Sequence, residues 1–194
     1  MSEIKTICVH LGKSGRVDPE FKELARATGE FIAKQGWKLV FGGAKIGTMG
    51  ILADGAMQAG GHVTGVIPEF LNSVEPFHGE LSELIVVKSM HERKKIMADM
   101  ADAFVTLPGG LGTLEELAEV LTWRQILLHD KPVVLMNCNN FWGPFVDLLE
   151  HFKNTHYMLS EHMTLFKIIE KVEDLPLALS NNQPDRRNHY SQWI

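Results

Sequence analysis

The stretch 103-AFVTLPGGLGTLEELAEVLTW-123 places three kinds of sequence in immediate succession. Ala103–Leu107 is a short apolar run, which is typical of a buried strand. Pro108–Gly112 is rich in glycine and predicts a tight loop, and Thr113–Leu128 then has the length and composition of a helix. A strand that leads through a short loop into a helix is the repeating unit of a parallel sheet covered by helices. The stretch therefore predicts an α/β fold.

The same alternation of short apolar runs and longer amphipathic runs extends over most of the chain. Further strands are predicted at Ile4–Leu11, Trp37–Phe41, Val63–Ile67, Leu84–Lys88, Pro132–Asn137 and Leu165–Val172. Helices are predicted from Asp18-Pro19 to Gly36, from the loop Gly42–Gly50 to Gly60, and at Met90–Met100, Phe141–Lys153 and Asp174–Leu179. Strands that do not alternate apolar and polar residues are buried on both faces. The chain therefore predicts a Rossmann-like, doubly wound parallel sheet of about seven strands with helices on both faces.

The sequence contains no linker, internal repeat or low-complexity tract that would divide it. A chain of 194 residues is of ordinary size for one α/β domain. We therefore expect a single Rossmann-like nucleotide-binding catalytic domain over residues 1–180. The polar tail 181–194 is expected to be frayed, because chain ends without apolar residues are poorly anchored.

Composition limits the class of protein and its partners. With 45% apolar and 22% charged residues, the chain has globular values, and its net charge of −5 disfavours nucleic acid as a partner. No apolar run approaches the roughly 20 residues of a membrane span, and Met1–Thr6 has no basic stretch followed by an apolar core, so we expect no signal peptide. Cys8 and Cys138 both lie in apolar runs, which favours buried thiols in a reducing compartment. The sequence predicts a cytoplasmic protein that binds neither membrane nor nucleic acid.

Four predicted strand-to-helix loops carry glycine or charged residues, and this fold brings all four to one edge of the sheet. They are Gly12–Gly15, Gly42–Gly50, Met90–Lys94 and Pro108–Thr113. Glycine lets backbone amides approach a phosphate closely, and the helix that follows adds its partial positive charge. The alternative is that these glycines only form tight turns. Two glycine-rich loops with Arg93 and Lys94 between them favour a phosphate site.

Three familiar motifs are incomplete in this chain. Gly12-Lys13-Ser14 resembles the end of a P-loop, but Ile7 stands where the first glycine is required. The loop Gly42–Gly50 lacks the spacing of a dinucleotide-binding loop, which disfavours NAD. His91-Glu92 is not followed by the second histidine of a zinc helix. We therefore expect no catalytic metal and no redox cofactor.

Two motifs together resemble the paired signature of the Lonely guy family. They are Met90-His91-Glu92-Arg93-Lys94 and Pro108-Gly109-Gly110-Leu111-Gly112-Thr113-Leu114-Glu115-Glu116. The similarity extends from Ile4 to about Leu179 and includes Leu121-Thr122-Trp123. Proteins of this family are cytokinin riboside 5′-monophosphate phosphoribohydrolases, often mislabelled lysine decarboxylases. The resemblance implies hydrolysis of the N-glycosidic bond of AMP or an N6-substituted AMP, which yields the free base and ribose 5-phosphate.

The resemblance also implies roles for individual residues. Arg93 and Glu116 match the catalytic pair of the family. The positions that match substrate contacts are Glu75, Lys94, Gly110, Leu111, Gly112, Thr113, Leu114, Glu115 and Thr122. Gly109 is expected to join its neighbouring glycines in holding the 5′-phosphate through backbone amides. Members of the family are homodimers with the active site at or near the interface, and Trp123 and Ile126–Leu128 would suit such an interface, although burial within one chain explains them nearly as well.

Glu116 suits this chemistry, because breaking an N-glycosidic bond builds positive charge on C1′ and the ring oxygen. The helix N-terminus favours an ionised Glu116, which would stabilise that charge or attack C1′ rather than protonate the base. The alternative is structural, since Thr113 and Glu116 have the spacing of a capping box. Arg93 stays protonated near neutrality, so we expect it to orient Glu116 or the nucleotide; otherwise it is a solvated surface charge. Met49 and Met90 either line the base pocket or fill the core.

Two departures from the family concern substrate preference more than reaction type. His10-Leu11-Gly12-Lys13-Ser14 stands where a Cys-Gly-Ser-Ser loop is usual, and Ala44-Lys45 where Gly-Asn is common. A rival hypothesis is a carrier of a nucleotide or phosphorylated cofactor that binds without hydrolysis. Arg93 and Glu116 disfavour it, since holding phosphate requires neither. Decarboxylation of lysine would require a Schiff-base lysine for pyridoxal phosphate, and no local pattern marks one.

Overall fold

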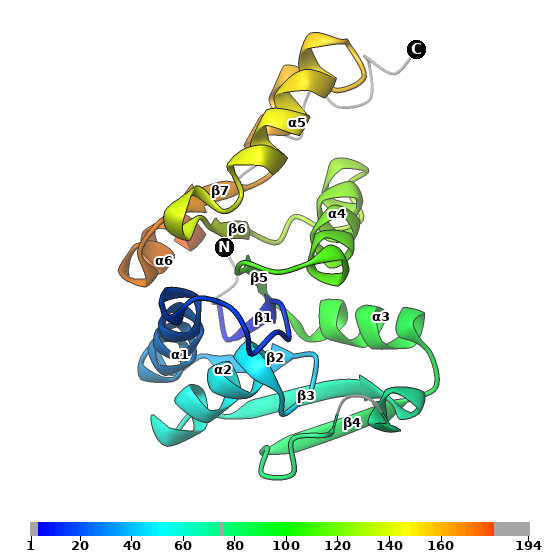
Figure 1. The fold of residues 1–194 in the computed structure, drawn as a ribbon. Helices are drawn as coiled ribbons and strands as arrows, with labels where there is room; N and C mark the ends of the chain where they lie inside the picture. The colour runs from blue at the N-terminus through cyan, green and yellow to red at the C-terminus, as the bar shows by residue number, and fades with distance from the viewer. Residues whose placement is uncertain (1–3, 74–75, 181–194) are drawn as a thin grey trace.

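The computed structural model describes residues 4–73 and 76–180, and these form a seven-stranded, wholly parallel sheet with helices on both faces (Figure 1). The strands are β1 (Thr6–His10), β2 (Lys38–Phe41), β3 (Val63–Pro68), β4 (Glu83–Val87), β5 (Ala103–Thr106), β6 (Val133–Met136) and β7 (Lys167–Ile169). Their order across the sheet is β4-β3-β2-β1-β5-β6-β7. The predicted Rossmann-like α/β class is therefore confirmed.

The helices divide into two groups, one on each face of the sheet. On one face lie α1 (Pro19–Lys34), α2 (Gly47–Gln58) and α6 (Leu175–Ser180); on the other lie α3 (Met90–Met100), α4 (Leu111–Gln125) and α5 (Gly143–Asn154). Short 3₁₀ turns complete the order at Glu69–Ser73, Cys138–Asn140, Ser160–Thr164 and Val172–Asp174. Along β1, Ile7 and Val9 face the first group, whereas Cys8 faces the second. Each face therefore has its own apolar core.

The chain order reverses between β1 and β5. The chain runs outward from β1 to β4 and then returns to add β5 on the other side of β1. At such a switch point the two connections lead to opposite faces of the sheet, and this leaves a crevice at the carboxyl ends of the strands. The backbone amide of Gly12, after β1, donates to the carbonyl of Pro108, after β5, at 3.2 Å, so the two loops meet there.

Some element boundaries differ from the prediction. The last strand, predicted at Leu165–Val172, is only Lys167–Ile169, because 3₁₀ turns occupy both flanks. The fourth helix begins at Leu111 with Gly110 as its N-cap, so Thr113 is inside the first turn. The capping-box alternative for Thr113 and Glu116 is therefore wrong. The predicted tail 181–194 lies outside the described residues, and the single domain over residues 1–180 stays a prediction.

Glycines allow α1 and α2 to pack backbone to backbone. A Cβ atom on Gly29 of α1 would overlap the carbonyl oxygen of Leu52 and lie 2.9 Å from the amide of Ala56, both in α2. A Cβ atom on Gly55 of α2 would in turn lie 2.7 Å from the carbonyl oxygen of Arg26. Backbone atoms cannot move aside as a flexible side chain does, so this contact requires glycine.

We expect Gly29→Ala to lower the free energy of unfolding by about 1–3 kcal/mol, because the added methyl overpacks the α1–α2 contact. Denaturant unfolding measures the change. Gly79→Ala is the matched control, since a Cβ atom there would meet nothing within 4 Å. A Gly29→Ala variant as stable as the Gly79→Ala variant would show that the two helices separate at little cost.

Candidate active site

The two residues expected to form the catalytic pair come together on the α3–α4 face of the sheet. Arg93 lies in the first turns of α3, and Glu116 lies in the second turn of α4. Nη2 of Arg93 is 3.8 Å from Oε1 of Glu116, and the two residues are only 5% and 7% exposed. The alternative of a solvated surface charge is therefore wrong for Arg93. The structure brings together a carboxyl group and a guanidinium that are remote in sequence.

Gly42, at the end of β2, provides the space that the guanidinium occupies. A Cβ atom on this residue would overlap Nη2 of Arg93 and lie 3.4 Å from Cε of Met49. Nη1 of Arg93 lies 3.8 Å from Sδ of Met90. Met49 and Met90 thus pack beside the guanidinium, and Gly42 acquires a role that the loop glycines alone did not predict.

The guanidinium of Arg93 is incompletely paired. Its Nε is buried and has no hydrogen-bond partner in the part of the chain that the structure describes. At 3.8 Å, the contact between Arg93 and Glu116 is an ion pair that is longer than a hydrogen bond. Burying a charge without partners is costly, and unpaired buried polar atoms are typical of ligand and water sites. The pair is therefore suited to receive further polar groups.

Burial controls the protonation of Glu116. Desolvation raises the pKa of its carboxyl group from 4.5 to about 7; the positive charge of Arg93 opposes this shift, and the negative charge of Glu115 adds to it. The helix N-terminus favours an ionised Glu116, but burial outweighs that effect and leaves the carboxyl group only partly ionised near neutral pH. Near neutral pH this carboxyl group can both accept and donate a proton.

Lys94 is held in a cluster between α3 and α4. Its Nζ contacts a carboxylate oxygen of Glu115 and lies 3.0 Å from Oε1 of Glu119. A cation held by two carboxylates is not free to pair with a phosphate unless those contacts break. The geometry favours a role for Lys94 in fixing α3 against α4, beside the catalytic pair.

The loop before α4 has the features of an anion-binding helix start. Gly110 is the N-cap, and the next two residues, Leu111 and Gly112, are exposed, so this end of the helix is open to a ligand. A Cβ atom on Gly109 would overlap the side chain of Thr113, which explains why glycine is needed there. Amides at an open helix N-terminus bind anions.

Glu75, one of the remaining predicted contacts, lies outside the described residues. The side chains of the other three, Leu111, Leu114 and Thr122, do not join this group. Thr122 is exposed, and its hydroxyl donates to the carbonyl oxygen of Ala118 at 2.7 Å. Leu111 is 82% exposed, and Leu114 is partly buried. Within one chain the structure therefore gathers Arg93, Glu116 and the glycine loop, but not these positions.

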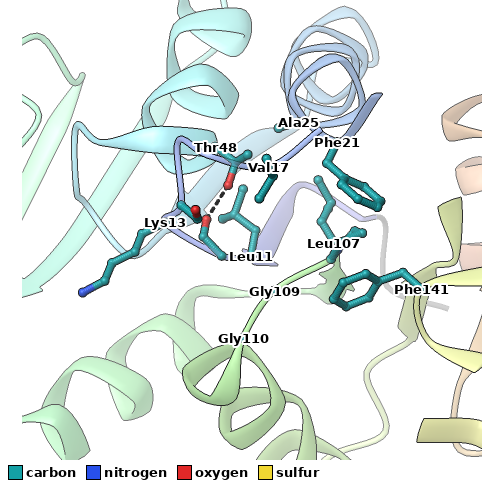
Figure 2. A pocket seen from close by; sticks show the side chains of 13 residues that line it. Leu11, Lys13, Val17, Phe21, Ala25, Thr48, Leu107, Gly109, Gly110 and Phe141 are labelled. Carbon is teal, nitrogen blue, oxygen red and sulfur yellow. Dashed lines mark hydrogen bonds between the residues drawn. The ribbon is translucent and has the colours of Figure 1, made fainter. Parts of the chain in front are cut away.

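An apolar cavity of about 330 Å³ lies at the strand switch point, on the side of α1 (Figure 2). Its lining consists of Leu11, Gly12, Lys13, Ser14, Val17, Phe21, Ala25, Thr48, Leu107, Pro108, Gly109, Gly110 and Phe141. The rings of Phe21 and Phe141 meet edge to face at 5.7 Å, while Lys13 points away from the cavity. The apolar wall residues Leu11, Ala25 and Leu107 belong to the core opposite Arg93 and Glu116. The loop Pro108–Gly110, which lines the cavity, also leads into α4, the helix that carries Glu116.

The described residues include neither a candidate metal site nor a candidate membrane span. Within residues 4–73 and 76–180, no group of three or more His, Cys, Asp or Glu side chains could hold a metal ion. The same described residues include no helix long and apolar enough to cross a membrane.

Two buried polar residues lie near this site: from the sequence, His10 was considered only as the start of an altered loop, and Thr106 was not singled out. His10 and Thr106 end β1 and β5, and both are buried. A polar side chain at the last position of an otherwise apolar strand was the available signal.

Comparison with known proteins assigns the chain to a family. The family described as "Possible lysine decarboxylase" matches residues 49–179. A cytokinin riboside 5′-monophosphate phosphoribohydrolase of Rhodococcoides fascians is 45% identical over 148 residues, which cover 76% of this chain and 75% of that protein. The enzyme of the same name, LOG, from Oryza sativa subsp. japonica is 36% identical over 184 residues, covering 95% and 76%. The chain therefore belongs to this family, and the resemblance to the Lonely guy proteins is confirmed.

Solved structures support the fold alone. The molybdenum cofactor carrier protein of Chlamydomonas reinhardtii aligns with a TM-score of 0.67 at 24% identity, covering 91% of this chain and 96% of that one. The molybdenum cofactor binding protein of Rippkaea orientalis gives the same TM-score, identity and coverage. Both share the Rossmann-like architecture.

The raised pKa of Glu116 predicts a pH dependence of stability. Because the folded pKa is about 7 and the ordinary value is 4.5, its contribution is fully present below pH 4.5 and is lost as the pH rises through 7. The difference corresponds to about 3 kcal/mol. We expect the free energy of unfolding of the wild type, relative to Glu116→Gln, to fall by this amount between pH 4.5 and 8. Denaturant unfolding at each pH measures this difference. If the free energies of unfolding of the two proteins changed with pH in parallel, the pKa of Glu116 in the folded protein would lie near its ordinary value.

Proposed function

We propose that this protein hydrolyses the N-glycosidic bond of AMP or an N6-substituted AMP and releases the base and ribose 5-phosphate. The observation that carries the proposal is the buried pair of Arg93 and Glu116 beside an open glycine-rich helix start. The names of the relatives support the substrate class, since they are cytokinin riboside 5′-monophosphate phosphoribohydrolases. No redox cofactor or metal enters the proposed reaction.

Binding begins with the 5′-phosphate. The backbone amides after Gly109 and Gly110, together with the hydroxyl of Thr113, bind it at the start of α4, where the helix dipole favours negative charge. The ribose then extends along α4 toward Glu116. In this pose the base lies on the side of α3, and Met49 and Met90 offer it apolar surface.

The chemical step breaks the bond between C1′ and the base nitrogen, which keeps the electron pair. Positive charge develops on C1′ and the ring oxygen, and the carboxylate of Glu116 stabilises it. The oxygen of a water molecule bonds to C1′ and one of its protons passes to the carboxylate of Glu116. The carboxyl group then donates that proton to the departing base nitrogen, which restores the carboxylate. A carboxyl group with a pKa of about 7 suits both transfers. Arg93 stays charged and holds Glu116 in place.

We expect Glu116→Gln to lower base release by at least about a hundredfold, because the amide carries no negative charge to stabilise the oxocarbenium ion. Adenine released from AMP and from N6-isopentenyl-AMP is measured by chromatography, and nucleotide binding is measured by calorimetry. Binding should persist in this variant. The exposed Asp99→Asn in α3 is the control for loss of one carboxylate.

The same assay separates hydrolysis from a carrier function. A wild-type protein that binds AMP tightly but releases no adenine would contradict the proposal and favour the carrier. Turnover by Glu116→Gln equal to that of the wild type would remove this residue from the mechanism.

We further propose that the protein acts as a homodimer in the cytoplasm. The end of α4 supports the dimer, because Ile126 and Leu128 are large, apolar and exposed, and Thr122 lies exposed on the same helix. A second copy on this surface would cover the apolar side chains and bring a polar residue such as Thr122 toward its site. The composition of the chain and its two free cysteines favour the cytoplasm.

We expect Leu128→Glu to shift the protein from dimer to monomer, because a charge buried in an apolar interface is strongly unfavourable. Sedimentation velocity measures the change in mass. Leu177→Glu in α6 is the matched control, since Leu177 is 66% exposed and Leu128 is 69% exposed. A monomeric wild type, or dimers of equal affinity in both variants, would contradict this interface.

A further inference from the structure

His10 and Thr106 form a cross-strand pair under the candidate active site. They are Cα partners at the carboxyl ends of the neighbouring strands β1 and β5. Both follow the alternation that points Cys8 and Phe104 toward α3 and α4, so they share the face of the sheet on which Arg93 and Glu116 meet. Their exposed fractions are 4% and 0%. Two polar side chains therefore lie buried side by side at the floor of the site.

Three buried polar atoms in this region lack partners. Nδ1 of His10, Oγ1 of Thr106 and Nε of Arg93 have no hydrogen-bond partner within the described residues. The guanidinium of Arg93 packs on Gly42, which ends β2, and β2, β1 and β5 are consecutive in the sheet. The three atoms therefore belong to groups over three adjacent strands. Buried polar groups are almost always satisfied, so three together indicate a bound polar molecule.

The surroundings of His10 determine which of its ring nitrogens carries a proton. Burial, followed by the positive charge of Arg93, lowers the pKa of His10 to about 4, although Glu119 and Glu115 oppose the shift. Burial also raises the pKa of the Cys8 thiol, so this thiol keeps its proton. Sγ of Cys8 lies 3.5 Å from Nε2 of His10, and a protonated thiol donates to that nitrogen. The neutral ring therefore carries its own proton on Nδ1.

The ring is also fixed in orientation. It stacks on Phe104 with centroids 5.8 Å apart and an interplanar angle of 23°. A neutral ring held on one side by Cys8 and on its face by Phe104 presents Nδ1–H as a donor that cannot turn away. The site thus offers two N–H donors, from His10 and Arg93, and one hydroxyl, from Thr106. A single water molecule matches this set, because its oxygen accepts two hydrogen bonds and its O–H groups donate others.

We propose that His10, Thr106 and Arg93 share one buried water molecule, and that His10 and Thr106 are positioning residues for the guanidinium of Arg93. The water accepts from Nδ1–H of His10 and Nε–H of Arg93 and donates to Oγ1 of Thr106. It fixes the Nε side of the guanidinium, and leaves Nη2 directed toward Glu116. The catalytic consequence rests on the proposed hydrolysis, whereas the water itself does not.

A crystal structure of the full chain at a resolution that defines water molecules tests the site without an activity assay. The expected result is one electron-density peak within hydrogen-bonding distance of Nδ1 of His10, Oγ1 of Thr106 and Nε of Arg93. The peak should be absent in Thr106→Val, which keeps the shape of the side chain but removes its hydroxyl. Direct contact between His10 and Thr106, with no peak between them, would overturn the proposal.

Kinetics test the positioning role. We expect His10→Phe, which keeps an aromatic ring against Phe104, and Thr106→Val each to lower kcat about tenfold, the equivalent of one hydrogen bond to a charged group. KM should change much less. Since both act through one water, the double variant should be no slower than the slower single variant. His10→Asn, whose side-chain amide can replace Nδ1–H, should recover most of the activity.

The controls distinguish the possible failures. Thr64→Val removes a buried hydroxyl from β3, outside the site, and should leave kcat unchanged. Losses that multiply in the double variant, or no rescue by His10→Asn, would overturn the positioning role. If the wild type releases no base from any nucleotide, the proposed hydrolysis fails, and the density peak still decides whether the water site exists.

Discussion

The burial of the Arg93 guanidinium is the constraint on which the site depends. A charge that is 95% removed from solvent must have space, a counter-charge and hydrogen-bond partners, or the fold loses several kcal/mol. Gly42 provides the space, because any side chain there would overlap Nη2. Glu116 provides the counter-charge, but at 3.8 Å it satisfies the guanidinium only in part. The incomplete pairing supports the proposed binding site, because a closed structural ion pair would leave the guanidinium no capacity for further hydrogen bonds.

That constraint also sets the protonation of the acid. The same burial that isolates Arg93 raises the pKa of Glu116 to about 7, against the attraction of the guanidinium. Lys94 does not neutralise Glu116, because Glu115 and Glu119 already hold it between α3 and α4. The cluster thereby fixes the spacing of the two helices and leaves the acid poised near neutral pH. Glu115 and Glu119 thus hold α4 against α3 through Lys94, while Glu116, on the same helix, has a pKa near 7.

The sequence was sufficient for the fold and, through the resemblance to a family, for naming the two residues that the structure brings together. Short apolar runs such as Ala103–Leu107 fixed the strands to within a few residues, because a strand buried on both faces has an unmistakable composition. The start of α4 was misjudged, since a glycine N-cap leaves no side-chain signal and Thr113 imitated one. The contact between Gly42 and Arg93, and the pairing of Lys94, depend on distances between remote segments, which local patterns do not encode. Burial of Glu116, which raises its pKa and so reduces the expected ionisation, depends on remote segments in the same way.

The pairing of Lys94 also bears on the name of the family. Decarboxylation through pyridoxal phosphate requires a lysine whose amine is free to form an imine. Burial alone lowers the pKa of Lys94, but the hydrogen bonds to Glu115 and Glu119 prevail and raise it above its ordinary value. A protonated amine held by two carboxylates is a poor nucleophile, because it has no free electron pair. Lys94, beside Arg93 and Glu116, is thus suited to hold the two helices together, which leaves the proposed chemistry to Glu116.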